Sequence, residues 1–379
     1  MRWADVQHQE RAVALLRRAL AGGRLHHAYL FEGPGGVGKE RTALALAARL
    51  LCQAPNRAPD ADACGRCHAC HMLAVGTHPD FLVVHRGLHK VHPSKAVRQR
   101  RGLFLTIDLI RHFLIEPIGL MPTQGRWRVY VVRDAERLNE EAQNALLKTL
   151  EEPPSHARIV LITSAPLQLL PTIRSRCQRV PFDRLPDAFV AAELERRLGL
   201  PRDAAAALAR LSDGRLGVAE SWARWGVLDE LPALAERVAQ LGCDGVPAFG
   251  EALVQRAESL TRRRLEMDEA AASDERRDEP DADEERLPAD MLRESLKLLY
   301  TLVAALYRDA LVTRHGCPQL RATPPQPAFE HRAALLPTAR LEAAVRAAAE
   351  AERMLDRNVA PQLVSEYLAV ALLGEVPEA

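Results

Sequence analysis

The stretch Ala28-Tyr-Leu-Phe-Glu-Gly-Pro-Gly-Gly-Val-Gly-Lys39 decides the fold of this chain. Residues 28–32 are mostly apolar and predict a short strand, and apolar residues recur at helical spacing over residues 41–51. A glycine-rich loop that ends in lysine between a strand and a helix is typical of a phosphate-binding loop. Such a loop turns backbone N–H groups toward phosphate oxygens, and the start of the helix adds its dipole. We therefore predict a nucleotide-binding loop formed by Gly33, Gly35, Gly36, Gly38 and Lys39.

Strands and helices alternate on both sides of this loop. Helical spacing is found at residues 11–21 and 140–150, and short strands are predicted at residues 81–84, 127–132 and 158–162. This alternation predicts a mostly parallel sheet with helices on both faces. After about Pro181 the strand-like runs stop, and helical patterns rich in Ala, Leu and Arg continue to Leu373. The predicted fold is an α/β domain followed by an all-α region.

Length and charge exclude several classes of protein. The 379 residues favour two or three domains. With 51 Lys and Arg against 50 Asp and Glu, the net charge of +1 excludes a uniformly basic coat for nucleic acid. No apolar run approaches the roughly 18–20 residues of a membrane span, and residues 1–10 lack the apolar core of a signal peptide. We therefore expect a cytoplasmic protein with no membrane partner.

Two charged segments resemble insertions. Residues 86–101 contain six Lys or Arg and no acid, and residues 266–290 contain twelve acids and three Arg. Both compositions favour solvation over burial, so both segments are predicted to be mobile and solvated.

Four of the seven cysteines fall within nineteen residues, at Cys52, Cys64, Cys67 and Cys70. Because a cytosol keeps thiols reduced, such a cluster favours a metal over disulfides. The two tight spacings allow the thiolates to surround one ion, which predicts a structural zinc site. His68 and His71 are alternative ligands, redox chemistry at Cys64 and Cys67 is the rival function, and free thiols are the plainest alternative.

Positions near the loop depart from what magnesium binding requires. The residue after the loop lysine should be Ser or Thr, whose hydroxyl holds magnesium, but here it is Glu40. The run 126–136 should supply a magnesium-binding acid at the end of its strand. Arg133 interrupts that position, and Asp134 and Glu136 are the acids nearby.

The longest motif is Asn144-Ala-Leu-Leu-Lys-Thr-Leu-Glu-Glu-Pro-Pro154. Together with residues 25–31 and Ser175-Arg176-Cys177, it resembles the bacterial DNA polymerase III clamp-loader family, whose members are AAA+ proteins. The resemblance covers about residues 1–220. It implies an AAA+ domain over residues 1–182 with the zinc module at 52–70, a helical lid at 183–226, and a helical oligomerisation collar at 227–379 that carries the acidic insertion at about 266–290.

Aligned on this motif, Arg133 takes the place of the magnesium-binding Asp of the family's motor subunits, and Asp134 the place of their catalytic Glu. Both magnesium ligands are then replaced, because Glu40 stands where the family has Ser or Thr. This pattern is similar to the delta-prime branch of the family. It implies no magnesium and no ATP hydrolysis by this chain, and it leaves ATP binding at Lys39 open. We also predict that Glu40 and Arg133 pair across the former magnesium position.

In this family the Arg of Ser-Arg-Cys projects into the ATP site of a neighbouring motor subunit. The resemblance therefore implies that Arg176 is an arginine finger acting in trans; an ordinary surface Arg is the alternative. It further implies a largely non-catalytic scaffold in a hetero-pentamer with motor subunits and the delta subunit, which loads the sliding clamp onto primed template DNA. Polymerase chemistry would belong to other holoenzyme subunits. An active motor-type ATPase and a zinc-dependent module that binds nucleic acid are the alternative functions.

Overall fold

A computed structural model describes residues 2–55, 58, 60–99, 104–272 and 288–374. The chain divides into two compact units. The first unit comprises residues Met1–Pro186 and Gly214–Val218, and the second comprises Asp187–Asp213 and Ala219–Ala379. The short segment 214–218 thus packs with the α/β unit although it lies among helices of the other unit in the sequence. The division of the helical residues into a lid and a collar stays a prediction.

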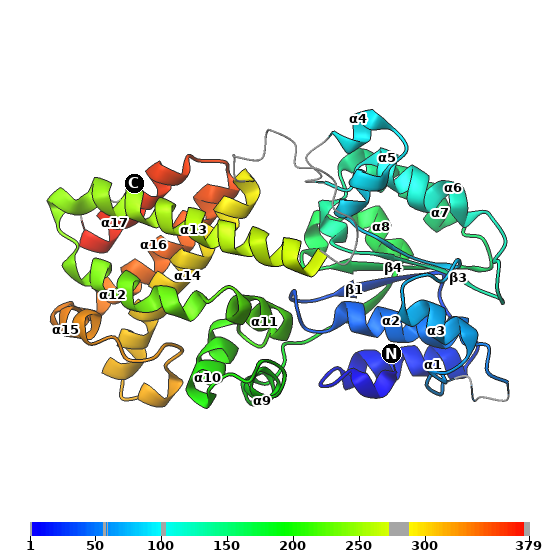
Figure 1. Cartoon of the computed structure of the whole chain (residues 1–379), viewed down its shortest axis with the longest axis horizontal. Coiled ribbons are helices and arrows are strands. Elements are labelled where there is room, and N and C mark those ends of the chain that lie inside the picture. Colours follow the sequence, from blue (N-terminus) through cyan, green and yellow to red (C-terminus); the bar gives the residue numbers. More distant parts are fainter. Residues whose placement is uncertain (1, 56–57, 59, 100–103, 273–287, 375–379) are drawn as a thin grey trace. The chain divides into compact units, whose positions relative to one another are not determined.

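The first unit is built on a five-stranded sheet of parallel strands (Figure 1). The strands are β1 (Ala28–Glu32), β2 (Phe81–Val84), β3 (Arg128–Val132), β4 (Ala157–Thr163) and β5 (Gln178–Pro181), in the order β2-β3-β4-β1-β5. Strand β1 lies between β4 and β5, and its first four residues are buried. Because the strands are parallel, their carboxyl ends meet at one edge, and the glycine-rich loop follows β1 there.

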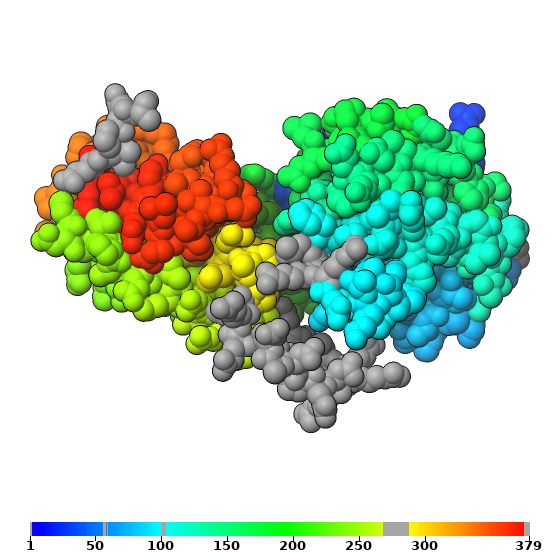
Figure 2. Space-filling model, turned by 90° about the horizontal axis from the view of Figure 1, so that it is seen from above, coloured from blue at the N-terminus to red at the C-terminus, as the bar shows by residue number. Residues whose placement is uncertain are grey.

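Helices cover both faces of this sheet, with α1, α2 and α3 on one face and α5 to α8 on the other (Figure 1). The helical elements of this unit are α1 (Glu10–Ala21), α2 (Lys39–Leu51), α3 (His68–Ala74), α4 (Lys95–Arg98), α5 (Ile107–Ile110), a π-helical turn (Arg111–Ile115), α6 (Glu116–Ile118), α7 (Glu140–Glu151) and α8 (Pro171–Arg176). Figure 2 shows side chains of this second group of helices spread over their face of the unit. Leu146 of α7 and Ile110 of α5 are fully buried there beside Leu161 of β4. The predicted α/β domain with a parallel sheet is confirmed.

Strand β5 was not predicted from the sequence. Its four residues, Gln-Arg-Val-Pro, include a charged side chain and a proline, and only Val180 is buried. Proline and an exposed arginine are tolerated at the edge of a sheet, where one side of the strand makes no ladder. The strand therefore depends on pairing with β1 rather than on a pattern of its own.

The basic segment at residues 86–101 is largely solvated, as predicted, but its described part contains helices that the sequence did not predict. Residues Arg86–Val91 form a 3₁₀ helix and Lys95–Arg98 form α4. Val97 is buried in the core and Leu88 packs against it, so apolar side chains anchor this basic segment, while Lys90, Lys95 and Arg98 are exposed. Residues 100–103 lie outside the described part of the chain. Most of the predicted acidic insertion, residues 273–287, lies outside it as well, and residues 266–272 continue helix α13.

The second unit is helical wherever it is described. Its helices are α9 (Asp187–Leu198), α10 (Arg202–Leu211), α11 (Leu216–Arg224, which begins in the first unit), α12 (Leu231–Gln240), α13 (Val246–Ala272), α14 (Ala289–Arg314), α15 (Pro327–Leu335), α16 (Thr338–Asp356) and α17 (Pro361–Leu373). Helices α13, α14, α16 and α17 pack against one another through Leu and Ala side chains. The predicted all-α region is confirmed. None of the helices in the described ranges is long and apolar enough to cross a bilayer.

Candidate functional site

The phosphate loop connects the end of β1 to the start of α2, as the sequence predicts. Two of its glycines are required by close packing. A Cβ on Gly33 would lie 2.3 Å from the carbonyl oxygen of Phe182, and a Cβ on Gly36 would lie 2.9 Å from the backbone nitrogen of Val218. Both residues have positive φ, at 146° and 77°. The loop is therefore held tightly between the chain after β5 and the segment 214–218, and any larger residue would displace its backbone.

Segment 214–218 reaches the loop by a backbone contact. The N–H of Gly217 donates to the carbonyl oxygen of Gly36 at 2.9 Å, and the N–H of Leu185 donates to the carbonyl oxygen of Gly214 at 2.9 Å. This segment contains Arg215. The contact between Gly217 and Gly36 therefore places a basic residue in a segment that lies beside the phosphate loop.

Lys39 is only 6% exposed. Its Nζ donates to the carbonyl oxygens of Gly33 and Pro34, at 2.5 Å each. Burial lowers the pKa of Lys39 to about 8, and the carboxylates of Glu136 and Asp134 oppose that shift. A lysine in this position folds its ammonium group over the mouth of the loop, where phosphate oxygens would compete with the two carbonyl groups for it.

Glu40 and Arg133 form the predicted ion pair. Arg133 Nε lies 3.3 Å from Glu40 Oε2, and the two side chains are 44% and 40% exposed. A pair this exposed contributes little to stability, about 0–1 kcal/mol. Its position matters more than its energy. It places a guanidinium at the end of β3, beside the loop, where a divalent cation would need a carboxylate.

Of the two acids after Arg133, Glu136 is the less exposed, and it is half-buried. Asp134 is exposed and adopts a left-handed backbone conformation, with φ of 51°. Glu136 Oε1 instead accepts hydrogen bonds from the hydroxyl of Ser164 at 2.5 Å and from its backbone N–H at 3.3 Å. Burial raises the pKa of Glu136, but hydrogen bonds from Ser164 and Thr163 outweigh burial and bring it below its usual value.

This contact joins the carboxyl ends of β3 and β4 and places a negative charge near Lys39. The sequence offered Glu136 as one of two acids and could not choose between them, because the choice depends on the turn after β3.

The four clustered cysteines come together. The Sγ atoms of Cys52, Cys64, Cys67 and Cys70 all lie within 4.8 Å of one another. Four thiolates around a zinc ion at about 2.3 Å are separated by about 3.8 Å, so the cluster suits one tetrahedral ion. Backbone N–H groups support the sulfurs: that of Cys67 donates to Cys64 Sγ at 3.2 Å, and that of Cys64 to Cys52 Sγ at 3.4 Å. In the described part of the chain, neither His68 nor His71 joins this group.

Arg176 is the last residue of α8, and its side chain is 34% exposed. The following Cys177 is buried, and burial raises the pKa of its thiol to about 12. Cys177 therefore packs into the core, while Arg176 stands at the surface. The motif Ser175-Arg176-Cys177 presents one side chain outward and buries the next.

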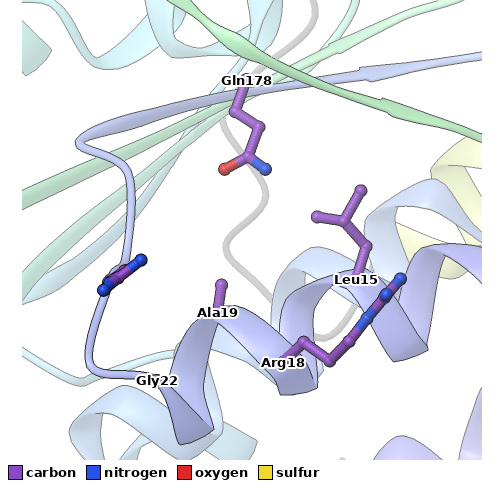
Figure 3. A pocket seen from close by; sticks show the side chains of 6 residues that line it. Leu15, Arg18, Ala19, Gly22 and Gln178 are labelled. Atoms are coloured by element: carbon purple, nitrogen blue, oxygen red, sulfur yellow. The ribbon is translucent and has the colours of Figure 1, made fainter.

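A separate open pocket of about 500 Å³ lies between α1 and the start of β5. Leu15, Arg18, Ala19, Gly22, Arg24 and Gln178 line it (Figure 3). Gln178 begins β5, and residues 22–24 precede β1, so this pocket lies at the amino edge of the sheet. The phosphate loop lies at the opposite edge, and the pocket is not part of that site.

Comparison with known proteins shows what this chain is similar to. The family model described as DNA polymerase III, delta subunit, matches residues 8–186. A DNA polymerase III subunit delta' from Pseudomonas aeruginosa is 39% identical over 226 residues, which are 58% of this chain and 63% of that protein. A DNA polymerase III subunit gamma/tau from Mycobacterium tuberculosis is 37% identical over 194 residues, which are 51% of this chain and 31% of that protein. The chain thus spans less than two thirds of the length of these curated relatives.

Among solved structures, a gamma subunit-related protein of DNA polymerase III from Thermotoga maritima is 19% identical, with a TM-score of 0.42 and coverage of 96% of this chain and 99% of that one. The sheet order, the loop and the flanking residues define a P-loop domain of the AAA+ type. By the family match and the curated relatives, the α/β part of the chain is similar to subunits of DNA polymerase III.

The buried ammonium of Lys39 predicts a pH-dependent stability. Because its folded pKa is about 8 and its unfolded value is near 10.5, the unfolded chain holds more protons between these values. The contribution of Lys39 to the free energy of unfolding therefore rises with pH between these two values, by up to about 1.4 kcal/mol per pH unit.

The measurement is urea unfolding of the wild type and of Lys39→Met at pH 8, 9 and 10. The free energy of unfolding of the wild type should rise relative to that of Lys39→Met as the pH rises. A difference between the two proteins that stays constant with pH would contradict the lowered pKa. The comparison cancels other groups that titrate in this range.

Proposed function

We propose that this chain is the delta-prime subunit of a DNA polymerase III clamp loader and a largely non-catalytic scaffold within it. The observation that carries this proposal is the ion pair of Glu40 and Arg133, 3.3 Å apart beside a well-formed phosphate loop. Magnesium-dependent hydrolysis needs a carboxylate and a hydroxyl at these positions, and this chain has a cation and an acid that satisfy each other. The phosphate loop then serves as structure, and ATP chemistry belongs to neighbouring subunits.

The second part of the proposal concerns Arg176. A guanidinium supplied in trans stabilises the charge that develops on the γ-phosphate during hydrolysis. Arg176 suits this role because it stands at the exposed end of a short helix that Ile173 anchors in the core. The adjacent buried Cys177 prevents this end of the helix from shifting.

The partners follow from the same proposal. The chain would assemble with motor subunits and the delta subunit as a hetero-pentamer, and the complex would place the sliding clamp on primed template DNA. The exposed Leu320, Leu335 and Leu363 of the helical unit suit an oligomerisation region, because exposed leucines are favoured at subunit interfaces. The proposed location is the cytoplasm, where replication complexes assemble on DNA.

Zinc is the ion that we propose for the four cysteines. Four sulfur ligands leave no position open for a substrate, so the ion would act in folding and not in catalysis. Cys70 packs with Ala48 of α2 and with Ala63, and the module would therefore brace the helix that follows the phosphate loop. Zinc-dependent DNA binding by this module alone has no support in these contacts.

A motor-type ATPase is the second candidate function. It is favoured by the intact loop with Lys39 and by the gamma/tau relative, which is nearly as similar as the delta' relative. The purified chain decides between the two: with magnesium and ATP we expect turnover no higher than that of Lys39→Ala, because no acid occupies the metal position. Magnesium-dependent turnover that Lys39→Ala abolishes would establish the second candidate.

Zinc content provides another test. We expect about one zinc ion per purified chain, lost in Cys67→Ser and retained in Cys317→Ser, which lies outside the cluster. Loss of the ion should lower the unfolding temperature of the α/β unit, because the metal contributes folding energy. A wild-type protein that binds no zinc when refolded with it would contradict this assignment.

The central test replaces Arg176 in a reconstituted loader whose only active ATP site is the one beside this subunit. Arg176→Ala should lower clamp- and DNA-stimulated ATP turnover at that site by about 10³-fold, while the complex still assembles. Arg179→Ala is the matched control, since Arg179 is exposed, lies three residues away and pairs with Glu32. ATP turnover at the wild-type rate in Arg176→Ala would show that Arg176 is not an arginine finger.

A further inference from the structure

Two oxygen atoms of this chain hold the guanidinium of Arg176. Its Nη2 donates to Glu151 Oε1 at 2.5 Å, and its Nη1 donates to the carbonyl oxygen of Thr172 at 3.1 Å. Thr172 belongs to the same helix, one turn earlier. Glu151 is the last residue of α7 and lies 25 residues earlier in the chain. The guanidinium is thus fixed between two separate elements.

Helix α8 is attached to α7 at both of its ends. At its start, the N–H of Leu170 donates to Gln143 Oε1 at 2.8 Å. At its end, Arg176 pairs with Glu151. Between these contacts Leu150 and Ile173 are 1% and 0% exposed within the same core. Because both helices are anchored in the core, Glu151 lies at a defined position against which the arginine is held.

We propose that Glu151 is a positioning residue for Arg176, a role that rests on the proposed function of Arg176 as a finger acting in trans. A free arginine side chain loses rotamer entropy when it meets a phosphate, and a guanidinium that is already held loses less. A guanidinium has five N–H donors. The two contacts use one donor each, and three remain for an incoming phosphate.

The exposure of this ion pair supports a role for Glu151 in positioning Arg176, and it argues against a role in withholding Arg176 from a phosphate. The side chains of Arg176 and Glu151 are 34% and 48% exposed, so water and salt screen their attraction. An exposed ion pair of this kind contributes little to stability. A triphosphate carries several negative charges and accepts from the same guanidinium in a closed interface, so Glu151 cannot withhold Arg176 from it.

Glu152 provides a matched control. It follows Glu151 directly, is exposed, and makes no ion pair within the described part of the chain. Glu152→Gln changes the net charge by the same amount as Glu151→Gln. Any difference between these two variants therefore reports the contact with Arg176 and not the overall charge.

The experiment uses the reconstituted loader in which only the ATP site beside this subunit is active. Glu151→Gln should lower the kcat of clamp- and DNA-stimulated ATP turnover by about fivefold and leave KM within about twofold, because positioning acts on the transition state. Glu152→Gln should match the wild type. In single-turnover measurements, Glu151→Gln combined with Arg176→Ala should match Arg176→Ala alone.

Three results would overturn the inference. The first is an unchanged kcat in Glu151→Gln. The second is a raised kcat in that variant, which would show that Glu151 restrains Arg176 from acting. The third is a loss of kcat from Glu151→Gln that persists in the Arg176→Ala background, which would show a purely structural role. The proposed function fails separately: it fails only if Arg176→Ala itself turns over ATP at the wild-type rate. Size-exclusion chromatography of each complex confirms that the variants assemble.

Discussion

The burial of β1 between β4 and β5 is the constraint on which the rest of the α/β unit depends. Its residues Ala28 to Phe31 are fully buried, and a parallel neighbour lies on each side. Because parallel strands end at the same edge, this arrangement brings the phosphate loop beside the residues that follow β3 and β4. The close approach of Gly33 to Phe182 then fixes the loop against the end of β5.

Charge at this edge is balanced without a metal ion. Arg133 faces Glu40, while the buried Lys39 lies in the field of Glu136, which Ser164 holds in place. Each cation thus has a carboxylate of this chain near it. Magnesium requires oxygen ligands in octahedral geometry, and in the proposed function these paired charges take the place of such ligands. The same unit carries Arg176 at the end of α8, where its side chain is 34% exposed.

Much of the α/β unit could be predicted from the sequence. Strand β1, the loop and α2 follow from apolar spacing and glycines, and the four cysteines follow from their spacing. Strand β5 and the helices at residues 86–98 could not be predicted, because Arg179 and the basic side chains obscure their patterns. Val97, His92 and Leu88 anchor the basic segment, and such isolated contacts have no periodic signal in a sequence.

By itself the sequence determined the chemistry available to this protein: a lysine after a glycine loop, a cation and an acid in place of magnesium ligands, four thiols, and an arginine between Ser175 and Cys177. The tertiary structure alone decided which groups meet. In the folded chain Arg133 pairs with Glu40, Glu136 bonds to Ser164 while Asp134 is exposed, and Glu151 pairs with Arg176. The physical reason is that such contacts join residues from different elements, and only the packing of strands and helices sets the distances between them.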